Sequence, residues 1–134
     1  MRRFVLGLGF LALLGTGPVA AQDPGIGARI FLNECATCHG LQGRGNGPMS
    51  PVLLVPPSNL TTLTRRHDGM FPVQRVVNRI DGRDPLVSHG SDMPIFGEFF
   101  DGVQNVALKA QNGQPILVSQ PIADLVIFLQ AIQE

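Results

Sequence analysis

Two cysteines and a histidine within five residues are the part of this chain best suited to chemistry. Cys35 and Cys38 are the only cysteines, and they frame the motif Cys35-Ala36-Thr37-Cys38-His39. Residues three apart on a helical turn share a side, so both sulfurs can reach one edge of a porphyrin. A Cys-x-x-Cys pair with His directly behind it is the attachment signature of a c-type haem. The motif predicts one haem held covalently through Cys35 and Cys38, with His39 as an axial ligand of the iron.

Three other chemistries remain open for these residues. A redox disulfide needs a strand before the pair and a helix after it, whereas the preceding residues look helical and a Gly-rich loop follows. A zinc site needs a fourth ligand, and the adjacent Cys38 and His39 are awkwardly placed around one tetrahedral ion. A structural disulfide would leave His39 without a role.

The N-terminus predicts export. Arg2 and Arg3 precede an apolar run over residues 4–14, and small residues ending at Ala21 offer a cleavage site. The run is shorter than the ~20 residues that cross a bilayer. We expect a signal peptide over residues 1–21, cleaved near Ala21, and a periplasmic mature domain over 22–134. An uncleaved membrane anchor is the alternative.

The charge and size of the mature chain narrow its function class. Loss of Arg2 and Arg3 leaves eight basic residues against ten acidic ones, a net charge of −2. A nucleic-acid-binding protein would show a strong basic excess, so we expect no nucleic-acid partner. A chain of this length has a small core, and a buried haem would add apolar surface for short helices to pack on.

The motif is expected at the end of a first helix. Asp23 is a suitable N-cap and Pro24 suits the first helical position, which predicts a helix running into Cys35. Residues 40–57 are dense in Gly and Pro and predict a long loop.

Two later helices are expected, so the predicted fold class is all-α. Apolar residues at helical spacing indicate a helix over 71–80, closed by Asp81-Gly82, and a second over 121–132 with Ser119 as its N-cap. Residues 84–118 carry turn signals and predict at most short helical pieces.

Over residues 24–134 the chain resembles the class I cytochrome c family, and in particular small bacterial periplasmic monohaem cytochromes. The resemblance implies short helices and long loops wrapped around one covalently bound haem, with the first helix crossing the last. The haem motif near the start is unlike the four-helix-bundle cytochromes c′, which carry it near the end. The matching positions are Cys35–His39, Gly27 and Phe31, Ile80–Arg83, Asp92–Gly97 with Met93-Pro94, and Leu125–Leu129 with Phe128.

The second axial ligand is expected to be Met93. It matches the family position, and Pro94 biases it to an extended backbone. Ligation by Met and His closes both axial positions and raises the reduction potential. The resemblance also implies that the carbonyl of Pro48 accepts a hydrogen bond from the His39 ring. The other candidate ligands are Met49, Met70, His67 and His89.

These features predict an electron carrier rather than an enzyme. It would be a monomer that passes single electrons between redox protein donors and acceptors. One alternative is a subunit of a periplasmic dehydrogenase or terminal oxidase complex, including a membrane-bound oxidase or reductase. Another is a haem enzyme or gas-binding protein with an open sixth site.

Five arginines could assist electron transfer, either by steering an acidic redox partner or by pairing with a haem propionate. Alternatively, they form only a solvated helix face. They are Arg65, Arg66, Arg75, Arg79 and Arg83.

Overall fold

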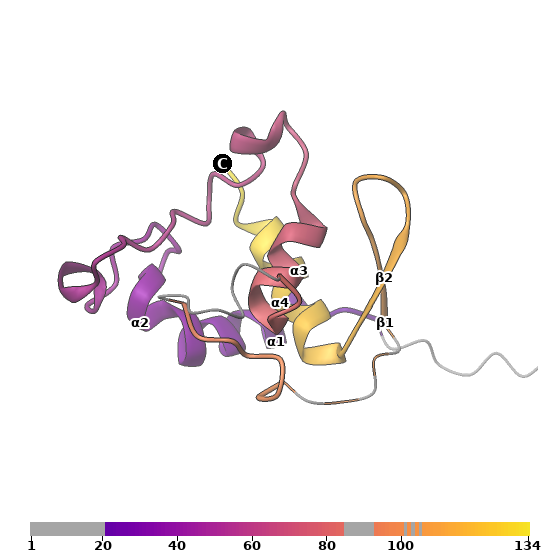
Figure 1. Ribbon diagram of the computed structural model, residues 1–134, viewed down its shortest axis with the longest axis horizontal. Coiled ribbons are helices and arrows are strands. Elements are labelled where there is room, and N and C mark those ends of the chain that lie inside the picture. The colour runs from indigo at the N-terminus through magenta and orange to yellow at the C-terminus, as the bar shows by residue number, and fades with distance from the viewer. Residues whose placement is uncertain (1–20, 85–92, 101, 103, 105) are drawn as a thin grey trace, which may run out of the picture.

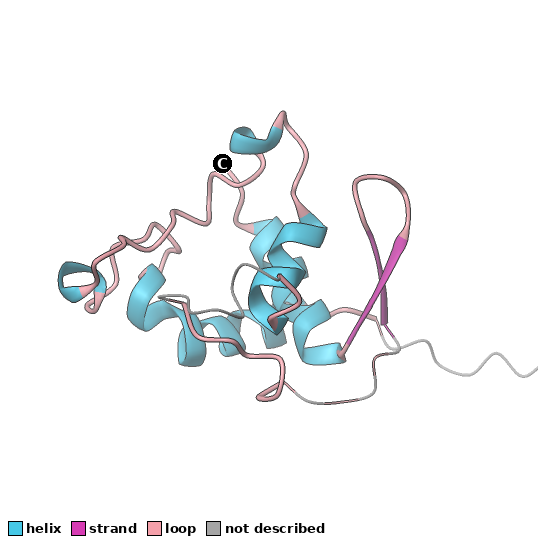
Figure 2. Ribbon diagram, in the orientation of Figure 1, coloured by secondary structure: helices cyan, strands magenta, loops and turns pink. Residues whose placement is uncertain are grey.

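A computed structural model describes residues 21–84, 93–100, 102, 104 and 106–134. The expected signal peptide, apart from Ala21, and His89 lie outside the described residues. None of the helices in the described part is both long and apolar enough to cross a bilayer. The elements are α1 (Pro24–Ile30), η1 (Phe31–Cys35), α2 (Ala36–His39), η2 (Ser50–Val52), η3 (Arg65–His67), α3 (Val73–Asp81), β1 (Val106–Lys109), β2 (Pro115–Val118) and α4 (Gln120–Ala131) (Figures 1 and 2).

Helix α1 begins as expected. The Asp23 side chain accepts hydrogen bonds from the backbone N–H groups of Gly25 (2.7 Å) and Ile26 (3.2 Å), and Pro24 occupies the first helical position. The capping carboxylate satisfies donors that no helical carbonyl can reach. The sequence prediction of this helix start is confirmed.

The predicted crossing of the first and last helices is also confirmed. At Gly27 an added Cβ would overlap the carbonyl oxygen of Asp124, so only glycine allows α1 to approach the α4 backbone this closely. One turn further on, the Phe31 and Phe128 rings pack with centroids 5.2 Å apart. Phe31 is only 1% exposed. Figure 1 shows α1 and α4 together near the centre of the molecule.

A buried carboxylate fastens the start of α1 to α4. Asp124 is 2% exposed and accepts hydrogen bonds from the Asp23 backbone N–H and the Gln120 side chain, both at 2.8 Å. Because a buried charge is tolerated only when hydrogen-bonded, Asp124 specifies where the two helices meet.

The segment before the motif is a π-helical turn, which the sequence did not predict. The backbone N–H of Ala36 donates to the carbonyl of Phe31, five residues earlier. In an α-helix of 3.6 residues per turn, residues five apart point in different directions, yet Phe31 and Ala36 are both buried. The wide turn therefore lets both pack inward and sets the direction in which α2 carries the motif. Such turns are frequent at functional sites.

Helix α3 forms close to the predicted range and ends at the predicted glycine. Gly82 takes a left-handed backbone, φ +82°, and its N–H donates to the carbonyl of Asn78. Val76, Val77 and Ile80 bury one face of α3 in the core that α4 also lines.

The prediction that residues 84–118 hold at most short helical pieces is wrong for 106–118, which form a β-hairpin. Strand β1 pairs antiparallel with β2, and Val106 lies opposite Val118. The connection closes through Gly113, at φ +82°, whose N–H donates to Ala110. Alternating burial along β1, with Asn112-Gly113 in the turn, is a hairpin pattern. In Figure 1 the hairpin and α2 lie at opposite ends of the helical core.

Helix α4 confirms the predicted terminal helix, with one difference at its start. Ser119 is the N-cap residue, but its buried hydroxyl makes no capping bond. The fold is mostly helical, with short helices and loops, as the predicted fold class requires.

Candidate functional site

The motif lies where the first helical segment ends. Cys35 is the last residue of η1, and Cys38 and His39 belong to the single turn of α2. Both cysteines are half-buried free thiols. The close crossing of α1 with α4 holds this turn in place, while both thiols remain partly exposed.

The loop after the motif folds back onto α2. The backbone N–H groups of Gly45 and Gly47 donate to the carbonyls of His39 (2.7 Å) and Cys38 (3.0 Å), and Met49 donates to Thr37 (3.0 Å). A Cβ on Gly47 would overlap the backbone of Thr37 and Cys38. Glycine at 47 therefore lets the loop satisfy the carbonyls at the end of the helix.

The His39 ring is oriented by Ser58. Its Nδ1 lies 2.9 Å from the Ser58 carbonyl oxygen, so with the proton on Nδ1 the Nε2 atom is available to a metal. The Pro48 carbonyl, expected here from the family resemblance, is not the partner of Nδ1. Gly45 explains why Ser58 takes this place. A Cβ at position 45 would overlap the Pro57 carbonyl, so only glycine lets Pro57 and Ser58 pack against the loop that follows the motif.

Burial shifts the pKa values of Cys35 and His39. It raises the pKa of Cys35 to about 12, and the nearby Glu34 carboxylate and Cys38 thiol add to the rise. Burial also lowers the pKa of His39, opposed by the hydrogen bond to Ser58. A neutral imidazole is the form that binds metals. The neutral Cys35 thiol lacks the thiolate character of redox disulfide centres.

The zinc alternative also loses support. Within the ranges that the structure describes, no three His, Cys, Asp or Glu residues come together as an ion-binding group. Cys35, Cys38 and His39 lie within five residues of one another but do not form such a group.

The residues beside the motif fit a haem. Residues 45–64 carry no charged side chain, and four large apolar side chains of this stretch are exposed, with Leu54 at 96%. Exposed apolar surface of this kind marks a binding site, and an apolar macrocycle attached at Cys35 and Cys38 would cover such surface. The four residues are Met49, Val52, Leu54 and Val55.

The candidate sixth ligands differ in burial. Met93 is half-buried and packs against the hydrophobic core, whereas Met49 and Met70 are 42% and 55% exposed. His67 is half-buried, and its Nδ1 lies 2.8 Å from the Leu63 carbonyl oxygen.

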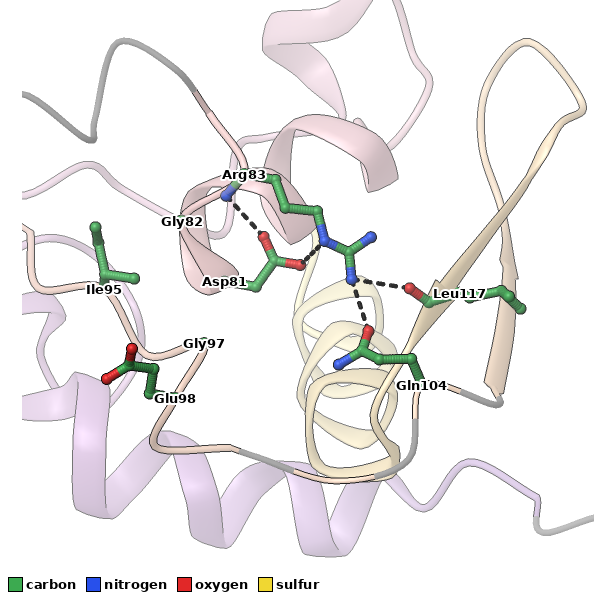
Figure 3. Close-up of a pocket in the computed structure, with 8 residues that line it drawn as sticks. All are labelled: Asp81, Gly82, Arg83, Ile95, Gly97, Glu98, Gln104 and Leu117. Carbon is green, nitrogen blue, oxygen red and sulfur yellow. Dashed lines mark hydrogen bonds and ion pairs between the residues drawn. The ribbon is translucent and has the colours of Figure 1, made fainter.

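Arg83 is engaged within the fold. Its Nε lies 2.7 Å from Asp81 Oδ2, and its Nη2 donates to Gln104 Oε1 (2.6 Å) and to the Leu117 carbonyl (2.9 Å) (Figure 3). These bonds tie the end of α3 to the hairpin, beside an open cavity of about 810 Å³. No residue of the haem motif lines this cavity. Arg83 lies beyond α3, so it does not share a helix face with Arg75 and Arg79.

Two contributors to the site escaped the sequence analysis. Ser58 acts through its backbone carbonyl. Every residue type possesses one, so the residue type at position 58 gives no signal of this role. Gly47 lay in a loop rich in glycine, and nothing distinguished it there. Only the folded chain shows which atoms meet His39.

Comparison with known proteins agrees with this geometry. The family model described as cytochrome c matches residues 26–133, which include the motif and the described helices α1 to α4 except the first two residues of α1. Comparison with curated proteins and with solved structures gave no match. The match spans most of the chain, so this protein belongs to the cytochrome c family, whose haem-based chemistry is electron transfer, and Cys35 and Cys38 are the cysteines that bind its haem.

Proposed function

We propose that this protein carries single electrons on its haem, with His39 and Met93 as the two axial ligands of the iron. The observation that carries the proposal is the His39 ring, held through Nδ1 by the Ser58 carbonyl at 2.9 Å with Nε2 left for the iron. A hydrogen bond of this kind orients a ligating histidine and raises its basicity.

The half-buried position of Met93 supports its assignment as the second axial ligand. It packs against the core from a loop anchored just downstream, where the Phe96 N–H donates to the Ile80 carbonyl at 2.8 Å. Bound haem supplies a one-electron couple, and a thioether ligand favours its reduced state. With His39 and Met93 at the two axial positions, no site is open to oxygen or peroxide, which favours electron transfer over catalysis.

Replacing Met93 with Ala is expected to abolish the charge-transfer band of the iron–sulfur bond and to lower the reduction potential, because the thioether is lost. Absorption spectra and redox titration of the purified ferric and ferrous protein measure both. Met70→Ala is the matched control, since Met70 is exposed and is expected to leave the band intact.

Binding of carbon monoxide distinguishes an electron carrier from a haem enzyme or a gas-binding protein. The ferrous wild type is expected to resist it, whereas Met93→Ala binds it readily. Ready binding by the wild type, or a band that survives Met93→Ala, would contradict ligation by Met93.

We further propose that the mature domain, residues 22–134, is exported to the periplasm and exchanges electrons there as a monomer. The signal-like N-terminus and the covalent haem support export, and the net charge of −2 gives no basis for a nucleic-acid partner. Cell fractionation is expected to recover a haem protein that begins at Gln22 in the periplasm and elutes as a monomer. Recovery in a stable complex with a dehydrogenase or oxidase would instead identify a subunit.

A further inference from the structure

The last two residues of the chain are bound to the segment that faces the axial histidine. The Glu134 backbone N–H donates to the Thr61 carbonyl at 2.8 Å, and the Glu134 carboxylate forms an ion pair with Arg44 in the loop after the motif. The end of the chain therefore packs against residues 58–64.

Gln133 makes the most specific of these contacts. Its Oε1 accepts from the Thr64 backbone N–H at 2.9 Å, and its Nε2 donates to the carbonyls of Leu60 (2.8 Å) and Leu129 (2.7 Å). All three bonds are partly buried. One carboxamide thus holds both ends of the 60–64 turn against the last turn of α4.

The same segment presents the carbonyl that orients His39. Ser58 lies two residues before Leu60, whose N–H donates to the Gly43 carbonyl at 2.7 Å. Gly45, two residues further along that loop, donates to the His39 carbonyl. Hydrogen bonds and two short stretches of backbone therefore connect the Gln133 side chain to His39. One connection runs through Leu60 and Ser58 to the His39 ring, and the other through Gly43 and Gly45 to the His39 carbonyl.

We propose that Gln133 is a positioning residue for the haem ligand His39. By fixing Leu60 and Thr64, its carboxamide holds the Ser58 carbonyl where it accepts the Nδ1 proton. The inference rests on the proposed ligation of the iron by His39.

This role has consequences beyond stability. A firm hydrogen bond at Nδ1 makes the imidazole a more basic ligand, which favours the ferric state. Loosening the 58–64 segment weakens that bond, so the Nδ1 proton exchanges faster and the reduction potential becomes more positive.

The test compares two variants of Gln133 with one of Gln130 in the haem-loaded protein. Gln133→Met keeps the length of the side chain but removes all three hydrogen bonds. Gln133→Glu keeps the acceptor for Thr64 and loses both donors. Gln130→Met is the matched control, because Gln130 is also half-buried near the end of α4, and its side chain has no hydrogen bond to the described residues.

Two measurements report on His39 itself: exchange of its Nδ1 proton, followed by NMR in the reduced protein, and the reduction potential. Gln133→Met is expected to speed exchange by about tenfold, the effect of losing an ordinary buried hydrogen bond. The potential is expected to rise by up to about 59 mV, which is a tenfold change in a one-electron equilibrium. Gln133→Glu should change both in the same direction.

Equal exchange and potential in Gln133→Met and Gln130→Met would overturn the positioning role, even if Gln133→Met were less stable. If Gln133→Met does not fold around the haem, Gln133→Glu decides in the same way. The ring-current shift of the His39 protons in the wild type is measured first. Its absence would overturn both the proposed ligation and this inference, whereas a ligated His39 that is insensitive to both variants would overturn the inference alone.

Discussion

Replacing both cysteines of the motif, Cys35→Ser with Cys38→Ser, is expected to abolish covalent haem attachment completely. They are the only cysteines in the chain, so no other thiol can form a thioether bond. A haem stain after denaturing electrophoresis checks this directly, because only covalently bound haem survives the denaturant.

The folded protein is expected to be lost together with the haem. In the double variant no attached macrocycle would cover the exposed Leu54 and its apolar neighbours, and a short chain buries too little surface by itself. The yield of soluble, protease-resistant protein measures this second effect.

Thr37→Ser is the matched control, because Thr37 is an exposed residue between the two cysteines. It is expected to stain like the wild type. Each single cysteine variant should retain some stain through its remaining thioether bond. A stained double variant would show that another residue attaches the haem.

Gly27→Ala is expected to destabilise the haem-bound protein by about 3 kcal/mol or more. The added Cβ overlaps the Asp124 carbonyl, and that atom belongs to the α4 backbone, so no side-chain rotation relieves the overlap. The helices must separate, which also disturbs the packing of Phe31 on Phe128. Guanidinium unfolding followed by the haem absorbance measures the change in the free energy of unfolding.

Gly25→Ala is the control from the same helix. A Cβ at Gly25 meets only the Asp23 side chain, at 3.1 Å, and the position is exposed. We expect a change within about 1 kcal/mol, because alanine also favours the helix. Equal stability of the two variants would mean that α1 and α4 do not need their close approach at Gly27.

The regular elements around the site could be predicted because their signals are local. Asp23-Pro24 marks a helix start whatever the rest of the chain does, and the apolar spacing of α3 and α4 records which face each helix buries. The family resemblance predicted that α1 and α4 cross at Gly27, where their close approach requires a residue without a side chain.

The hairpin and the π-turn were missed for different reasons. Residues 106–118 did contain a local hairpin signal, with the alternation of β1 and Asn112-Gly113, but the turn residues around it fit an irregular loop equally well. The π-turn has no such signal. It forms because Phe31 and Ala36 are both drawn into one core, and that core exists only after α4 has packed.

The sequence by itself determined where the haem is attached, since thioether chemistry needs two thiols at a fixed local spacing, which Cys35 and Cys38 supply. The tertiary structure decided which carbonyl orients His39, and it chose Ser58 rather than Pro48. Backbone carbonyls are chemically alike in every residue, so only the path of the chain selects among them. That path is set by contacts between distant segments, from Gly45 against Pro57 to Gln133 on Leu60 and Thr64.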